Sequence, residues 1–166
     1  MANAGLVLAG AFLPHLFAEL ELLGEDDDGR PCMRDPDAAS RAVHLLQYLV
    51  DGSTDTPEPG LVLNKLLCGL APSDPVERAV ELEPRERGLG DRLLGAILAG
   101  WPALARTSVA GLRETFLRRE GRLEHGPNGW RLTVQRKTVD VLLDELTWTR
   151  SLVEHRWMPE PLYVTW

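Results

Sequence analysis

The sequence predicts an α+β fold, with about five helices followed by a small C-terminal antiparallel β-sheet or hairpin. Apolar residues recur with helical spacing through residues 11–120. After residue 121, apolar and polar residues alternate around a turn signal, and no internal repeat interrupts the chain. For 166 residues, of which 44% are hydrophobic and 26% charged, we expect one globular domain over 1–166, helical over 11–120 and β-rich over 121–166.

The first two helices are predicted at residues 12–23 and 36–50. Pro14 is tolerated if it lies in the first turn of the earlier helix, where its missing N–H is not needed. Asp35 is well placed to cap the second helix, because its carboxylate can accept a hydrogen bond from the first helical turn. The polar segment at 25–36 between the two helices is predicted to be a loop.

Three further helices are predicted at residues 60–70, 85–100 and 107–120. The segment 60–70 is almost entirely apolar, so we expect it near the centre of the core. The helix at 85–100 contains three internal glycines, each of which weakens a helix by about 1 kcal/mol, so tertiary contacts must hold it. A short extended piece is predicted at 79–82.

The last part of the chain carries strand signals. A β-hairpin is predicted over residues 122–136, with Asn128 and Gly129 at its turn, because Asn-Gly is a strong hairpin signal. Residues 138–146 are compatible with either a helix or a strand. Residues 151–157 and 161–166 are predicted to be extended.

The net charge argues against a nucleic-acid partner, and the shortness of the apolar run argues against a membrane partner. The net charge is −7, and residues 1–60 hold 11 acidic and 3 basic residues. An acidic chain repels phosphate backbones. The apolar run at 4–13 is too short to span a bilayer and has no preceding positive charge, so it does not resemble a signal peptide. Cys32 and Cys68 are too few for a disulfide framework, and we expect reduced thiols in a cytosolic setting.

No pattern of residues points to a catalytic or metal centre. The four histidines lack metal-ligand spacing, and the acidic run at 25–29 fails the ligand pattern of a calcium loop. Neither a nucleophile elbow nor a phosphate-binding loop is present. We therefore expect no enzyme, no cofactor and no metal. A Ser or Cys nucleophile with a distant histidine stays open as an alternative, because triads converge only in three dimensions.

The candidate functional residues are instead partner contacts. Four of the five tryptophans fall in the last 37 residues, and tryptophan is enriched at interface hot spots. The polar pair at 64–65 lies inside an apolar helix. It is interpreted first as the solvent edge of that helix, with a partner contact or a satisfied buried asparagine as the alternative. The predicted interface residues are Asn64, Lys65, Arg113, Trp157, Tyr163 and Trp166.

The chain resembles the contractile injection system tape measure proteins, which belong to phage-tail-like particles. The resemblance covers nearly the whole chain in the expected order. It rests on NAGLVL (3–8), FLP (12–14), AVHLLQYL (42–49), LVLNKLLCGL (61–70), WPAL (101–104), TSVAGLRETFLRREGRL (107–123), GWRLTV (129–134), DVLLDEL (140–146) and WMPEPLYVTW (157–166).

This resemblance implies a bacterial tail-assembly protein of the tube lumen, without enzymatic activity, cofactor or catalytic residue. Its implied partners are the inner tube, the spike and the baseplate hub, with cargo and self-association as further candidates. Its implied location is the bacterial cytoplasm during assembly and then the assembled particle.

A tape measure sets tube length by its own extent, and this chain is too short for that role. Fully helical, 166 residues would reach only about 250 Å, and a compact chain of this size has a radius of gyration of about 15 Å. We therefore expect either an excised domain of a longer protein, with Met1 added, or a short paralogue that acts as an anchor or adaptor.

A winged-helix nucleic-acid-binding module is an alternative function, because the helix at 107–120 precedes a hairpin. In that layout five arginines could line one face: Arg113, Arg118, Arg119, Arg122 and Arg131.

Overall fold

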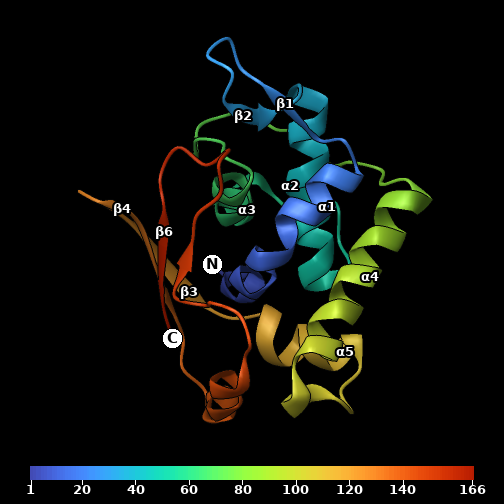
Figure 1. Cartoon of the computed structure of the whole chain (residues 1–166), viewed down its shortest axis with the longest axis vertical. Helices are drawn as coiled ribbons and strands as arrows, with labels where there is room; N and C mark the ends of the chain where they lie inside the picture. Colours follow the sequence, from blue (N-terminus) through green and yellow to red (C-terminus); the bar gives the residue numbers. More distant parts are fainter.

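The computed structural model describes residues 1–166 and confirms the α+β class. Helices occupy one side of the molecule and a small sheet the other (Figure 1). The α-helices are α1 (Leu13–Glu19), α2 (Pro36–Asp51), α3 (Val62–Leu67), α4 (Pro84–Gly100) and α5 (Val109–Leu112). Shorter helical segments are the 3₁₀ helices η1 (Ala4–Phe12), η2 (Glu58–Leu61), η3 (Pro102–Leu104) and η5 (Thr138–Glu145), and the π-helical segment η4 (Arg113–Leu117).

Helix α2 forms where the sequence predicts it, because its start and stop signals are local. The carboxylate of Asp35 accepts a hydrogen bond from the Ala38 N–H at 2.7 Å. At the other end Gly52 adopts a left-handed φ of +79°, which ends the helix without steric cost. Helices α3 and α4 likewise lie within one to three residues of their predicted ends.

The 3₁₀ helix η1 is the most enclosed element, and the sequence did not predict it as a helix. It lies between the sheet and the helical layer (Figure 1), and its residues 4–10 are all buried. A segment enclosed on every side has no polar face, so it shows no amphipathic period. A Cβ atom on Gly5 would lie 1.7 Å from the carbonyl oxygen of Phe116, so only glycine allows this approach.

Three other local predictions are wrong. The predicted helix at 12–23 ends at Glu19, as α1. The predicted loop at 25–36 contains a small hairpin of β1 (Leu23–Glu25) and β2 (Pro31–Met33), whose strands pair in antiparallel fashion. Residues 79–82 form no strand. Strands of three residues carry too short an alternation to be read from sequence.

The C-terminal sheet has the strand order β3–β4–β6–β5, with β3 (Gly121–Gly126), β4 (Gly129–Val134), β5 (Leu152–Val153) and β6 (Leu162–Thr165). The predicted hairpin is confirmed, although its turn lies at residues 127–128, because Gly126 pairs with Gly129. The predicted antiparallel sheet is wrong in one respect: β4 and β6 pair in parallel, which makes the sheet mixed. Pairing between distant strands leaves no turn signal in the sequence.

Arg119 joins the two regions of the molecule. Its side chain is fully buried and donates hydrogen bonds to the carbonyl oxygens of Thr115 at 2.7 Å and Gln135 at 2.9 Å. It also pairs with Asp140 at 2.5 Å. Its guanidinium carbon lies 5.7 Å from the ring centroid of Trp166. The Arg119 guanidinium is therefore the point at which four segments meet: the end of η4, the chain after β4, η5 and the end of β6.

Candidate docking surfaces

Asn64 and Lys65 are both fully buried, so their first interpretation as the wet edge of a helix is wrong. The Asn64 side-chain oxygen accepts a hydrogen bond from Asn3 at 2.8 Å. The Lys65 ammonium pairs with Glu58 and donates to the carbonyl oxygen of Asp74 at 2.7 Å. Asn64 is thus a satisfied buried asparagine, and neither side chain is presented on the surface.

Two other predicted interface residues are used inside the chain. Arg113 donates to the carbonyl oxygens of Leu49 at 3.0 Å and Tyr48 at 2.8 Å, both in the last turn of α2. The Trp157 indole is 8% exposed and donates to the carbonyl oxygen of Leu67 at 2.9 Å. Their roles toward a partner stay predictions.

Tyr163 is exposed, whereas Trp166 is only partly exposed. Trp166 is half-buried against Arg119, and its indole N–H has no hydrogen-bond partner. Tyr163 is 44% exposed, one of three large hydrophobic residues at the surface. The strand β6 alternates buried and exposed residues, and this alternation turns Tyr163 outward while Leu162 and Val164 enter the core.

The solvent-facing side of the C-terminal sheet is hollowed around Tyr163. In register, Arg131 of β4 lies between Glu124 of β3 and Tyr163 of β6. These side chains border an open hollow of about 610 Å³. We call this surface the outer sheet face; it is lined by Glu124, Asn128, Arg131, Thr133, Tyr163 and Thr165.

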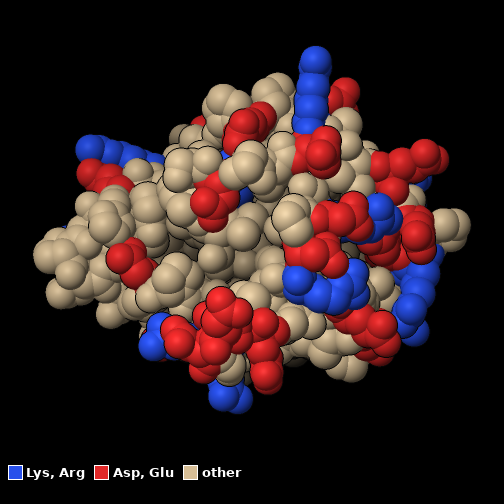
Figure 2. Space-filling view, turned by 90° about the horizontal axis from the view of Figure 1, so that it is seen from above, with Lys and Arg blue, Asp and Glu red and all other residues tan.

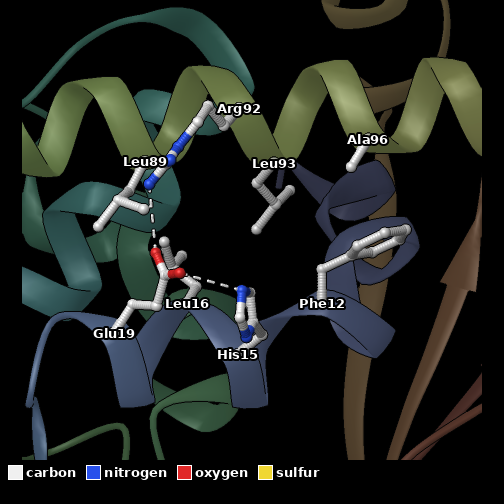
Figure 3. A pocket seen from close by; sticks show the side chains of 8 residues that line it. All are labelled: Phe12, His15, Leu16, Glu19, Leu89, Arg92, Leu93 and Ala96. Atoms are coloured by element: carbon white, nitrogen blue, oxygen red, sulfur yellow. Dashed lines mark hydrogen bonds and ion pairs between the residues drawn. The ribbon is translucent and has the colours of Figure 1, made fainter.

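A second surface is an apolar groove of about 260 Å³ between α1 and α4, which run antiparallel (Figure 3). Its lining residues recur every three or four positions on both helices, as expected for facing helical surfaces. Glu19 bridges its mouth, at 3.2 Å from His15 and 3.3 Å from Arg92. The lining of this α1–α4 groove is Phe12, His15, Leu16, Glu19, Leu89, Arg92, Leu93 and Ala96.

The five arginines of the winged-helix alternative do not form one surface. Arg119 is fully buried, Arg113 is bonded to the end of α2, and Arg122 pairs with Glu124 at 2.8 Å. Seen from the end that carries the β1–β2 hairpin, acidic and basic side chains lie beside one another between wide uncharged areas (Figure 2). The geometry gives no support to a nucleic-acid interface of this layout.

The histidines and cysteines of the chain are not brought together. His44 contacts the carbonyl oxygen of Glu77 at 2.7 Å, and His155 stacks on the ring of Trp157. Both cysteines are free thiols, and burial raises the pKa of the Cys68 thiol far above its usual range. No group of three potential metal ligands occurs, and no helix is long and apolar enough to cross a membrane.

Comparison with known proteins places the chain in one class. Residues 1–166 match the family described as contractile injection system tape measure protein, so the chain belongs to that family. It is therefore a module of a contractile injection system, a phage-tail-like particle, and its family is structural and not a family of enzymes. No curated protein and no solved structure matches the chain.

Proposed function

We propose that this chain is a non-catalytic docking module of the tape measure, and that its outer sheet face contacts the inner tube, the spike or the baseplate hub. The observation that carries this proposal is Tyr163, an exposed aromatic side chain that lines an open hollow. Tyrosine and arginine dominate binding energy at protein interfaces, and Tyr163 has Arg131 beside it in register.

The dimensions of the fold support a role in docking and not a role as the ruler of tube length. The longest helix, α4, has 17 residues and so spans about 25 Å. No element of this fold extends along a tube for the distance that a ruler requires. The contribution of the module to the particle therefore lies in its surface.

Position in the sheet decides how the proposal is tested. Deleting residues 163–166 would remove most of β6, which lies between β4 and β5 and contributes buried Leu162 and Val164. Such a deletion removes part of the core together with the surface. Single substitutions of outward-facing residues separate binding from folding.

The experiment measures binding of the full chain to the purified inner-tube, spike and hub proteins of the same injection system. Tyr163→Ala and Arg131→Glu should each weaken one of these complexes by roughly tenfold or more, because each changes a residue type that forms hot spots at protein interfaces. Val141→Ala is the control, since Val141 is 67% exposed but lies on η5, outside the hollow. It should bind like the wild type.

Circular dichroism and thermal unfolding confirm that each variant stays folded. Equal affinity of wild type and both variants for a bound partner removes this face as the docking surface. Failure of all three proteins to bind refutes the proposed partners.

A further inference from the structure

The exposed side of α4, beside the α1–α4 groove, has two positions without a side chain. Gly88 and Gly95 are exposed, and a Cβ atom added at either position would meet nothing within 4 Å. Glycine at an exposed helix position weakens a helix relative to alanine. Neither glycine is needed for a contact within the chain, whereas Gly90 faces Leu45 and Leu49 at 3.3–3.4 Å.

The groove adds apolar surface along the same helix. Phe12 and Ala96 lie at one end of it, and Leu93 lies between α4 and α1 (Figure 3). Arg92 projects at its mouth with its side chain 73% exposed, and its ion pair with Glu19 spans 3.3 Å. Exposed pairs of this kind contribute little to stability, so the guanidinium is free to exchange partners at little cost.

The charged residues on this side of α4 are placed so that two copies of the helix can pair opposite charges. Asp91 and Arg92 are adjacent and both exposed, and the two glycines lie three residues to either side of them, at positions 88 and 95. If two copies of α4 cross antiparallel about a two-fold axis between positions 91 and 92, each Asp91 faces the Arg92 of the other copy. Gly88 then faces Gly95 of the other copy, which lets the two backbones approach closely.

We infer that this side of α4, with the adjoining α1–α4 groove, binds a second copy of the chain. A two-fold interface requires one patch that is complementary to itself, and the arrangement of opposite charges and small residues around positions 91 and 92 meets that requirement. The inference is independent of the outer sheet face, which lies on the C-terminal sheet.

The test uses two charge variants of the full chain, alone and mixed. Asp91→Arg places four positive charges around the two-fold axis, and Arg92→Asp places four negative ones, so each variant should self-associate at least about tenfold more weakly than wild type. In the mixture, the arginines of one variant face the aspartates of the other. Sedimentation analysis should therefore detect a species of twice the monomer mass in the mixture but not with either variant alone.

A third variant separates association from folding. Gly95→Gln supplies a better helix former at a site with open space, so the monomer should be more stable to heat. The same side chain fills the space needed for close approach, so association should weaken. A merely structural role for Gly95 predicts no such opposition.

A wild-type chain that stays monomeric at about 100 μM overturns the inference. So does self-association that the charge variants leave unchanged, or a mixture that fails to recover it. If Gly95→Gln instead loses binding to another injection-system protein while the wild type stays monomeric, the surface belongs to that protein and a second copy is excluded.

Discussion

The helical region and the C-terminal sheet are held together by contacts of different range. Helix α2 carries its own signals, with Asp35 at its start and Gly52 at its end. The strand β6 pairs in parallel with β4 and also in antiparallel fashion with β5, and none of the three is joined to another by a tight turn. Local signals define α2 and the β3–β4 hairpin, whereas β6 joins the sheet only when the chain has already folded back on itself.

The junction between the two regions offers the largest effect. Arg119→Ala should lower the free energy of unfolding by about 3–5 kcal/mol, because it leaves buried carbonyl oxygens and Asp140 without their partner. Since Arg119 contacts both regions, helix content and tryptophan fluorescence should fall together during chemical denaturation.

The matched control is Arg122→Ala, three residues along the chain. Arg122 has a side chain that is 77% exposed in its pair with Glu124, so its loss should cost no more than about 1 kcal/mol. Similar effects of the two substitutions would contradict the role of Arg119 as a junction.

Alanine substitutions at two glycines of α4 separate the effect of helix propensity from the effect of tertiary packing. Gly88→Ala should raise the free energy of unfolding by up to about 1 kcal/mol, because nothing lies within 4 Å of the new methyl group. Gly90→Ala should gain less or lose stability, because its Cβ would press on Leu49 at 3.3 Å. Thermal unfolding at low protein concentration measures both, and an equal gain at the two positions would contradict the packing of α4 on α2.

The smallest effect concerns pH and the contact between the C-terminal region and η1. Burial lowers the pKa of His155 below its ordinary value of 6.5, and its hydrogen bond with the Gly10 backbone opposes this in part. The unfolded chain therefore binds a proton at higher pH than the folded one. The stability from a neutral His155 is complete above pH 6.5 and is lost as the pH falls through its lowered pKa.

His155→Phe should keep the stacking on Trp157 and flatten this part of the pH dependence, measured as the denaturation midpoint. Replacement of His15, whose side chain is 82% exposed, by glutamine is the control and should leave the dependence as in wild type. A His155→Phe profile identical to that of the wild type would show that His155 does not contribute.

Among the candidate interface residues, exposure can be predicted from the sequence only where it follows from local alternation. The outward direction of Tyr163 follows from the alternation along 161–166, which the sequence shows. The burial of Lys65 could not be read from its neighbours, because its partners are Glu58 and the carbonyl oxygens of Pro72 and Asp74. A charged residue is buried when such partners surround it, and only the folded chain supplies them.

The sequence by itself determined the α+β class, the limits of α2, α3 and α4, the C-terminal hairpin and the resemblance that the family match bears out. These features depend on caps, turns and periodicities that act over a few residues. The tertiary structure alone decided the central place of η1, the parallel pairing of β4 with β6 and the burial of Arg119. Each of these depends on groups far apart in the chain, whose approach is set by packing the whole core and leaves no short-range pattern to read.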